Sequence, residues 1–265
     1  MIKKRIIFSL LYQDGFFYLS RNFKLQKVGD VNWLINNFGF GETCNYIDEL
    51  ICLHVKKKPT NKDKENVFKD IAILRKKIFV PITLGGGVRT LMDVNNFFLN
   101  GADKILLNTS IYDKKLMQEI SEIYGEQAIS IMIDYMRSEN NDINDIYINC
   151  GTEYKTNLKS FFDSYYENIP CGEIILNSIE DDGTGNGLDL KVIEKIPKSL
   201  NNKSLLLMGG AGKAEHIVDG LSFKNISGIV TANLFNFLGT GLEVSRKKSL
   251  DNKINLVNFD TEIKI

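Results

Sequence analysis

Short runs of apolar residues alternate with stretches of helical periodicity along most of the chain. The runs that predict strands are Arg5–Leu11, Glu49–Val55, Phe79–Leu84, Lys104–Leu107, Ala128–Ile133, Glu173–Leu176, Ser204–Met208 and Gly228–Thr231. Between several of them, apolar residues recur at the spacing of one helix face, as in residues 67–74 and 116–123. Thr90 followed by Asp93 predicts a capping box at the start of one such helix. The pattern therefore predicts consecutive strand–helix units.

An internal repeat relates the two halves of the chain. The matching segments are Arg5–Leu11 with Ala128–Asp134, Asp48–His54 with Gly172–Ser178, Leu84–Arg89 with Met208–Lys213, and Ile105–Ser110 with Ile229–Leu234. They occur in the same order and at nearly constant spacing, which favours a duplication of a half-barrel. Two such halves predict an α/β fold of the (β/α)8 (TIM) barrel type. We expect one domain over residues 1–265, with half-barrels of roughly 1–124 and 125–250. A doubly wound open sheet is the alternative, but it does not explain the duplication.

The composition is that of a globular protein, with 43% hydrophobic and 25% charged residues. Lys+Arg and Asp+Glu both total 33, so the charge balance predicts neither nucleic acid nor a membrane surface as a partner. We expect no signal peptide and no membrane span. Four scattered cysteines predict a cytoplasmic protein with reduced thiols. With two distant histidines we expect no metal site, and no motif predicts a cofactor.

Glycine-rich and polar segments follow several of the predicted strands, where the chemistry of such barrels is located. Glycines let backbone N–H groups approach an anion, and the start of the next helix adds its positive end. The candidate phosphate- or substrate-binding residues are Gly85, Gly86, Gly87, Asn108, Thr109, Asp182, Gly183, Thr184, Gly209 and Gly210. Two of the loops are related by the repeat, so we expect two anion sites across one mouth and a phosphorylated small molecule as substrate. The alternative is that the glycines only permit tight turns.

Asp134 ends an otherwise apolar strand, so its carboxylate should point into the mouth of the barrel. A carboxyl group with a pKa raised by partial burial is a candidate general acid or base. The alternative is a helix N-cap or an ion-pair partner for Arg137.

The chain resembles, over nearly its whole length, the cyclase (synthase) subunit of imidazole glycerol phosphate synthase. The matching stretches are Arg5-Ile-Ile, Asp14-Gly15, Gly29-Asp30, Asp48-Glu-Leu50, Leu84-Gly-Gly-Gly-Val-Arg89, Gly101-Ala-Asp-Lys104, Asn108-Thr109, Ile133-Asp134, Gly172-Glu173, Asn177-Ser-Ile179, Asp182-Gly-Thr184 and Gly209-Gly-Ala-Gly212. The resemblance implies a barrel fed with ammonia by a separate glutaminase and makes Asp134 one of two catalytic carboxylates. It also implies phosphate contacts at Gly86, Asn108, Thr109, Asp182, Gly183, Thr184 and Gly210.

Three positions at the mouth depart from the family. The other catalytic aspartate of the family is replaced by Leu11, the lysine of the following loop by Leu19, and the aspartate ending the second strand by His54. Leucine cannot transfer a proton, so the two-carboxylate cycle cannot run as in the family. The chain is similar in this respect to a divergent branch from surface-polysaccharide gene sets, which is thought to amidinate an N-acyl amino sugar. We expect His54 to assist Asp134, although a histidine in a strand is more often structural.

A second matched set lies near the starts of four strands: Arg5, Glu49, Lys104 and Glu173. They should ring the lower opening of the barrel and pair, because burying four unpaired charges would be costly. In the family, the corresponding ring gates the path of ammonia from the glutaminase, which we expect to dock at this N-terminal face. The alternative is a salt-bridged plug that only stabilises the barrel.

These observations lead to three hypotheses for function. The first is a synthase subunit that uses ammonia from a glutaminase to amidinate or aminate a phosphorylated or nucleotide-linked sugar. The second is the ordinary histidine-pathway cyclase with a substitute for the missing aspartate. The third is a non-catalytic barrel that activates a glutaminase, but phosphate loops would serve no purpose there.

Overall fold

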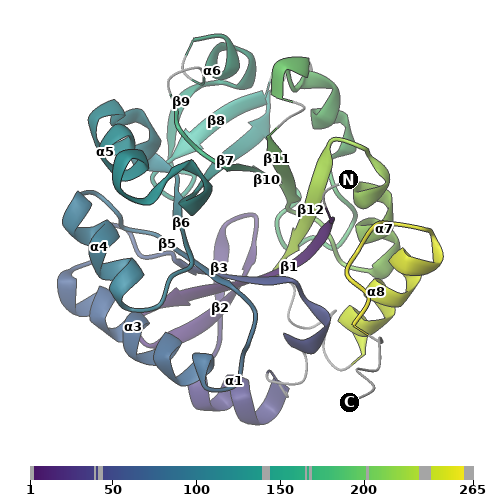
Figure 1. Cartoon of the computed structure of the whole chain (residues 1–265), viewed down its shortest axis with the longest axis horizontal. Helices are drawn as coiled ribbons and strands as arrows, with labels where there is room; N and C mark the ends of the chain where they lie inside the picture. Colours follow the sequence, from purple (N-terminus) through teal and green to yellow (C-terminus); the bar gives the residue numbers. More distant parts are fainter. Residues whose placement is uncertain are drawn as a thin grey trace.

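Eight parallel strands close into a barrel in the computed structural model, which describes residues 3–38, 40, 44–138, 144–164, 166, 169–200, 203–232 and 240–259 (Figure 1). They are β1 (Arg5–Gln13), β4 (Glu49–His54), β5 (Ile82–Gly85), β6 (Lys104–Leu107), β7 (Ile129–Arg137), β10 (Glu173–Ser178), β11 (Ser204–Met208) and β12 (Ile226–Thr231). Each pairs with the next, and β12 pairs with β1 to complete the circle. The predicted (β/α)8 barrel is confirmed.

Helices surround the barrel and cover the outer face of its strands (Figure 1). They are α1 (Val31–Phe38), α3 (Asn61–Arg75), α4 (Leu91–Leu99), α5 (Lys114–Tyr124), α6 (Leu158–Ser164), α7 (Ala214–Ser222) and α8 (Gly241–Asp251). Short 3-10 turns are η1 (Cys44–Tyr46), η2 (Thr109–Tyr112), η3 (Glu126–Ala128), η5 (Leu190–Lys195) and η6 (Lys198–Leu200). The predicted capping box of Thr90 and Asp93 opens α4, and Thr60 and Asp63 form a second one at α3.

Alternation along the strands divides the apolar residues into two clusters. In β1, Ile6, Phe8 and Leu10 face outward into the main core between strands and helices, whereas Ile7 faces the barrel interior. The inner cluster consists of Ile7, Ile51, Leu106, Met132, Ile175, Leu206, Met208 and Val230. The interior is therefore a largely apolar column with Ser9 of β1 as a buried polar side chain, and the charged groups lie at its two ends.

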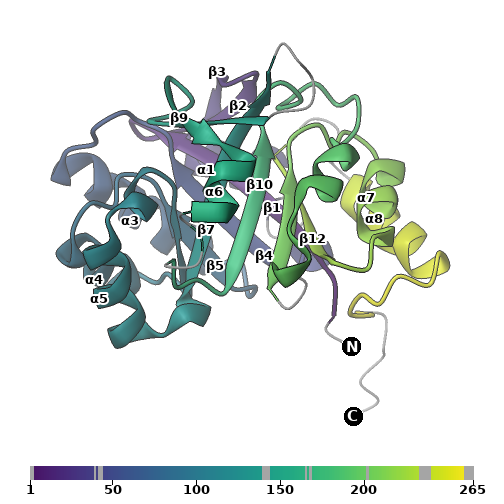
Figure 2. The same ribbon diagram turned by 90° about the horizontal axis from the view of Figure 1, so that it is seen from above.

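Two antiparallel hairpins, which the sequence analysis did not predict, extend barrel strands beyond the mouth. β2 (Phe16–Arg21) and β3 (Lys24–Gly29) continue β1, and β8 (Asn144–Ile148) and β9 (Glu153–Asn157) continue β7. In Figure 2 the labels β2, β3 and β9 gather at one end of the molecule. The hairpins occupy repeat-related places, so the duplication includes them. They were missed because their strands are short and polar, unlike the apolar runs of the barrel.

Strand limits differ from the sequence prediction in six of the eight barrel strands, and two of the differences have a clear structural cause. β7 continues past Asp134 to Arg137, because its last residues pair with β8. Phe79 precedes β5 and is 94% exposed, so it belongs to a surface loop and not to the strand. Positions 233 and 234 of the fourth repeat segment lie outside the described residues.

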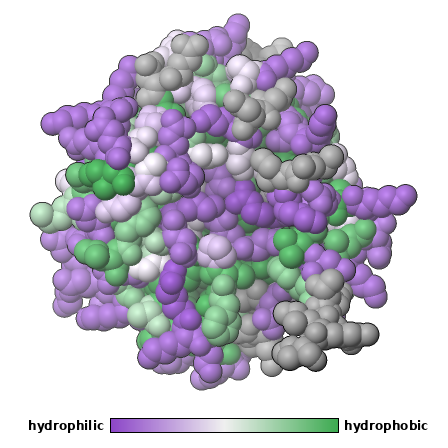
Figure 3. Space-filling model, viewed as in Figure 1, coloured by the Kyte–Doolittle hydropathy of each residue, from purple (hydrophilic) through white to green (hydrophobic). Residues whose placement is uncertain are grey.

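In the described part of the chain, no helix is long and apolar enough to span a bilayer. Figure 3 shows a face on which hydrophilic residues predominate, with smaller hydrophobic areas between them.

Candidate active site

Asp134 is the central acid of the barrel mouth. It is 5% exposed and lines a cavity of about 600 Å³ at the C-terminal ends of the strands. Asn177 Nδ2 donates to its Oδ1 at 2.8 Å from the neighbouring strand β10, and Asn108 Nδ2 approaches its Oδ2 at 3.2 Å from the end of β6. Two amides therefore fix the orientation of one carboxyl group. Arg137, the alternative partner considered for Asp134, is engaged elsewhere.

Burial raises the pKa of Asp134 to about 7, although the hydrogen bond from Asn177 lowers it and the nearby charge of Asp182 raises it. A carboxyl group with such a pKa exists in both protonation states near neutral pH. It can therefore donate a proton in one step and accept one in another, which fits a general acid or base at this position.

The two asparagines differ from what the sequence suggested. Asn108 was predicted to bind phosphate, but its amide nitrogen points inward to Met132 O at 2.9 Å and to Asp134. Asn177 was not among the predicted site residues, because only the strand register shows that it lies opposite Asp134. The sequence did carry a signal for Asn177. Asp134 and Asn177 each directly follow the apolar run of a predicted strand, and these two strands are neighbours in the barrel.

Across the repeat, Leu11 and Leu53 occupy the places of Asp134 and Asn177. Leu11 pairs with Leu53 between β1 and β4, just as Asp134 pairs with Asn177 between β7 and β10. Both leucines line the cavity, and Leu11 is 6% exposed. Asp14 does not replace the missing carboxylate, because it lies in the turn after β1 and pairs with Lys56 at 2.7 Å. One wall of the mouth is thus apolar where the other is acidic.

His54 lines the same cavity as Asp134 from the end of a different strand, β4. It follows Leu50 and Cys52 on the outward-facing register of β4, and its ring centroid is 6.1 Å from that of Tyr12. Burial lowers the pKa of His54 to about 4, so the imidazole is neutral at pH 7. Neither ring nitrogen has a hydrogen-bond partner among the described residues. His54 and Asp134 line the same cavity, but no hydrogen bond joins their side chains among the described residues, so the assistance expected of His54 stays a prediction.

The predicted glycine loops lie in two lobes of the mouth. Gly86 and Gly87, with Asn108 and Thr109, border the large cavity, whereas Gly183, Gly209 and Gly210 border a second cavity of about 280 Å³. Gly85 ends β5 just before the first loop. Basic side chains line both lobes: Lys57, Lys58 and Arg89 in the first and Arg21 and Lys24 in the second. This arrangement suits a substrate with an anionic group at each end.

Close backbone approach also requires two of these glycines. A Cβ on Gly86 would lie 2.0 Å from His54 O, and one on Gly210 would lie 1.9 Å from Gly187 O. Both residues have a positive φ, of 94° in each case. Substitution of either one would therefore disturb the backbone whether or not an anion binds there, so a test of phosphate binding has to use the basic side chains.

The hairpin β2–β3 is hydrogen-bonded to Asp182, in the loop after β10. Ser20 Oγ donates to Asp182 Oδ2 at 2.5 Å, and the backbone N–H of Phe23 donates to the same oxygen at 3.0 Å. Burial raises the pKa of Asp182, although these hydrogen bonds oppose the shift. The Thr184 hydroxyl is bonded within its own loop, to Asp181 O at 2.8 Å. Asp182 and Thr184 thus order the loop in this structure, while their predicted substrate contacts stay a prediction.

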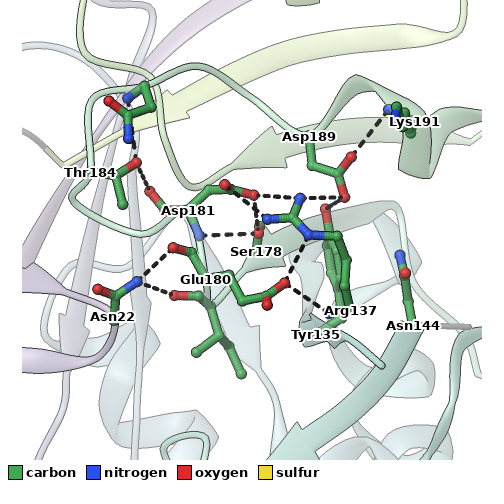
Figure 4. A network of polar contacts seen from close by, with 12 residues as sticks. Asn22, Tyr135, Arg137, Asn144, Ser178, Glu180, Asp181, Thr184, Asp189 and Lys191 are labelled. Atoms are coloured by element: carbon green, nitrogen blue, oxygen red, sulfur yellow. Dashed lines mark hydrogen bonds and ion pairs between the residues drawn. The ribbon is translucent and has the colours of Figure 1, made fainter. Parts of the chain in front are cut away.

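Arg137 clamps the loop that follows β10 (Figure 4). Its guanidinium lies between three carboxylates, 2.9 Å from Glu180, 3.1 Å from Asp181 and 3.5 Å from Asp189. The Asn22 amide, from the turn of the hairpin β2–β3, donates to the backbone of the same loop. The loop that borders the second lobe is therefore held by β7 on one side and by the hairpin on the other.

At the opposite end of the barrel, Arg5, Glu49, Lys104 and Glu173 form a closed ring of ion pairs. Arg5 contacts Glu49 at 2.9 Å and Glu173 at 2.5 Å, and Lys104 contacts them at 2.8 and 3.1 Å. Burial alone would raise the pKa of Glu173, but the charges of Arg5 and Lys104 outweigh burial and lower it. The predicted pairing is confirmed, whereas its role as a gate stays a prediction.

Three hydroxyl groups complete this ring and were missed in the sequence. Thr83 donates to Glu49 at 2.5 Å, Ser130 donates to Glu173 at 2.8 Å, and Ser204 accepts from Arg5 at 2.8 Å. They begin the strands between the charged ones, so the alternating register would have identified them. Asp103, next to Lys104 in the sequence, pairs with Arg75 at 2.6 Å. Among the described residues, no group of three or more His, Cys, Asp or Glu side chains could hold a metal ion.

Comparison with known proteins agrees with this geometry. The model of the family "Histidine biosynthesis protein" matches residues 45–239. A protein of Parasynechococcus marenigrum (strain WH8102), provisionally named imidazole glycerol phosphate synthase subunit hisF2, is 41% identical over 94% of this chain and 91% of its own length. The imidazole glycerol phosphate synthase subunit HisF of Hydrogenobaculum sp. (strain Y04AAS1) is 31% identical over 97% and 99%, and that of Bacillus cereus (strain Q1) is 30% identical over 89% and 92%.

The fold is a (β/α)8 barrel with a buried acid at its mouth, and its relatives are cyclase (synthase) subunits, so the chain is an enzyme of this class. The chain belongs to the family of histidine biosynthesis proteins and is a HisF-like cyclase subunit.

Proposed function

We propose that this chain is the synthase subunit of a glutamine-dependent enzyme and adds ammonia to a phosphate-bearing acceptor. The observation that carries the proposal is the position of Asp134 at the top of an apolar column whose other end is the ring of Arg5, Glu49, Lys104 and Glu173. Neutral ammonia suits such a column, because its transfer into apolar surroundings costs far less than that of an ion. The two basic lobes supply the binding sites for the acceptor.

The first candidate acceptor is a phosphorylated or nucleotide-linked sugar. Leu11 supports it, because an apolar side chain lies at the position that the repeat relates to Asp134, and leucine cannot transfer a proton in a cyclisation. Addition of ammonia to an N-acyl carbonyl, with loss of its oxygen as water, moves two protons from nitrogen to that oxygen. A single carboxyl group that alternately accepts and donates a proton can serve both transfers. The names of the three relatives described above do not mention this acceptor.

The second candidate is the cyclisation that forms imidazole glycerol phosphate, and the names of the relatives favour it over the first. Asp182 is then the available second carboxyl group, since it lines the same cavity and burial raises its pKa. In this structure it is bonded to Ser20 and Phe23, so the hairpin β2–β3 has to release it before it can transfer a proton.

The partner in both cases is a glutaminase docked at the N-terminal end of the barrel. A depression of about 620 Å³ at this end is lined by Arg5, Asp48, Phe79 and Pro81 among others. Phe79 is 94% exposed there, and a large exposed apolar side chain beside the ring is typical of an interface residue.

One assay distinguishes the two acceptors. The chain is purified with a co-expressed glutaminase and given ammonium chloride or glutamine, together with either the histidine-pathway ribonucleotide or a set of nucleotide-linked N-acyl amino sugars. Mass spectrometry follows the products. We expect conversion of a sugar and failure to complement a strain that lacks the cyclase. Turnover of the ribonucleotide together with complementation would establish the second candidate instead.

The N-terminal docking is tested with Lys104→Glu, which places like charges in the ring, and with Phe79→Ala. Both should reduce product formed from glutamine more than product formed from ammonium. Equal loss with both nitrogen donors, in protein that is still folded, would contradict the docking model.

A further inference from the structure

Inside the barrel, two side-chain oxygens have no hydrogen-bond partner among the described residues: Ser9 Oγ and Asn177 Oδ1. Ser9 is two residues after Ile7 in β1, so its side chain lies on the same inner face of the barrel. Asn177 lies opposite Asp134 on the neighbouring strand. A buried acceptor without a donor costs on the order of 1–3 kcal/mol, so such an atom is rarely left unpaired without a reason. Of the two, Asn177 belongs to the cavity.

The orientation of the Asn177 amide follows from its neighbours. Its nitrogen donates to Asp134 Oδ1 at 2.8 Å, so its oxygen faces away from that carboxylate. Met132 Sδ lies 3.9 Å from the same nitrogen, and Met208 on β11 pairs with Asn177. Both methionines belong to the inner apolar cluster. Asn177 is 3% exposed. Its oxygen is thus a buried acceptor at the junction of the apolar column and the mouth.

We propose that Asn177 Oδ1 accepts a hydrogen bond from ammonia and holds the nitrogen nucleophile beside Asp134. The proposal rests on the proposed function, in which ammonia reaches the mouth through the barrel. Ammonia has three N–H donors and one lone pair, so a bond to Asn177 leaves the lone pair free for the acceptor. The same carboxamide orients Asp134 through its nitrogen, so one side chain places both the nucleophile and the acid/base group.

The repeat provides an internal contrast for this assignment. The position related to Asn177 is Leu53, which carries no acceptor and pairs with Leu11 instead of a carboxylate. An ammonia molecule at the top of the column therefore meets an acceptor on the side of Asp134 and an apolar surface on the other side. Nitrogen delivery is directed to one half of the mouth.

Binding is tested by NMR, without any acceptor substrate. The side-chain amide signal of Asn177 is identified by its loss in Asn177→Leu and is followed at alkaline pH while ammonium chloride is added. Tetramethylammonium chloride is the ionic control, because it has no N–H donor. The signal of Asn144 is the internal control, since its amide is equally buried but lies on β8 outside the barrel.

We expect a saturable shift of the Asn177 signal with ammonium only, and no such shift of the Asn144 signal. No response of Asn177, or an equal response in the tetramethylammonium series, would overturn the proposal and mean that the oxygen serves water or the acceptor itself. The unmodified enzyme separates this result from the proposed function. A shift without turnover of any acceptor sinks the function alone, and turnover with ammonium but no shift sinks the site alone.

Kinetics with ammonium separate nucleophile binding from the support of Asp134. One hydrogen bond contributes about 0.5–1.5 kcal/mol, so Asn177→Leu should raise KM for ammonium about threefold to tenfold in addition to lowering kcat. Asn108→Leu is the matched control, because Asn108 also contacts Asp134 but has no free oxygen at the column. It should lower kcat and leave KM for ammonium unchanged. If both variants alter only kcat, Asn177 merely positions Asp134.

Discussion

The two half-barrels share the same framework but differ in the polar groups that they place at the two ends of the barrel. The second half supplies Asp134 and Asn177 to the mouth, where the first half has Leu11 and Leu53. At the other end, the acids Glu49 and Glu173 are related by the repeat, whereas both cations, Arg5 and Lys104, come from the first half. The positions related to those cations are Ala128 and Gly228, which bear no charge. The two copies of the repeat therefore carry different polar groups at related positions.

The two ends of the barrel also differ in how well their polar groups are paired. Every charge of the ring is paired, and its hydroxyl neighbours complete the hydrogen bonds. The mouth keeps a carboxyl group with a raised pKa and a buried oxygen without a described partner. Such unfavourable groups persist where binding or catalysis uses them.

The strongest test of the comparison is Asp134→Asn. Removing the only acid of the polar pair should lower kcat by roughly 10²–10⁴-fold, the usual contribution of a positioned acid/base group. The rate of the unmodified enzyme should depend on a group with a pKa near 7, and the variant should lose that dependence. Steady-state rates across pH measure both effects. An unchanged pH profile in the variant would remove Asp134 from the chemistry.

Breaking the ring tests the contribution of the first half. Lys104→Met leaves Glu49 and Glu173 sharing Arg5, and breaking a buried ion pair costs about 3–5 kcal/mol of unfolding free energy. The folded-state pKa of Glu173 is lowered, so the ring stabilises the fold above the unfolded-state pKa and less as pH falls. The difference in unfolding free energy between the unmodified protein and Lys104→Met should therefore become smaller at acidic pH. Urea unfolding at several pH values measures this difference.

The matched control is Arg75→Met, which removes the more exposed ion pair with Asp103. Its expected cost is about 0–1 kcal/mol. Equal losses in the two variants would mean that the ring is no more important to stability than a surface pair.

Asp134 should also destabilise the fold when it is ionised. Its folded-state pKa of about 7 lies above the unfolded value, so the penalty is absent in acid and grows as pH rises toward 7. The limit is about 4 kcal/mol, from roughly 3 pKa units at 1.36 kcal/mol each. Asp134→Asn should therefore raise the unfolding free energy more at pH 8 than at pH 4, as thermal or urea unfolding at both values would show. A gain independent of pH would contradict the raised pKa.

A further test introduces equivalents of Asp134 and Asn177 into the first half-barrel, at Leu11 and Leu53. Leu11→Asp alone buries a carboxylate without a donor, and adding Leu53→Asn supplies the amide that Asn177 gives to Asp134. A double-mutant cycle should give a favourable coupling of about 1.5–3 kcal/mol, the range for a hydrogen bond to a charged group. Zero coupling would show that the two sides of the mouth are not equivalent in geometry.

The smallest effect concerns the hairpin. Ser20→Ala removes one hydrogen bond to Asp182, about 1 kcal/mol, which should speed hydrogen exchange in β2–β3 about fivefold. Exchange in β8–β9, the repeat-related hairpin without this contact, should stay constant. A uniform increase in both hairpins would mean that the contact does not fasten the mouth.

The sequence predicted the barrel because parallel strands buried on both faces give long apolar runs, and it placed Asp134 correctly because the residue ends such a run. It did not distinguish inner from outer positions at the strand ends. Asn177 was overlooked, since a shift of one residue along a strand changes which face its side chain points to. The roles of Asn108 and Asp182 depend on contacts between residues far apart in the chain, which no local pattern reports.

The two hairpins have a consequence for association between molecules. A closed barrel has no free strand edge, but β3 and β9 each pair with one described neighbour and so restore an edge. Lys24 and Lys27 on β3, and Glu153 and Lys155 on β9, place charges along those edges. Charged side chains on an edge strand oppose pairing with the edge of another molecule. The hairpins thus extend the sheet beyond the barrel without offering an uncharged edge for aggregation.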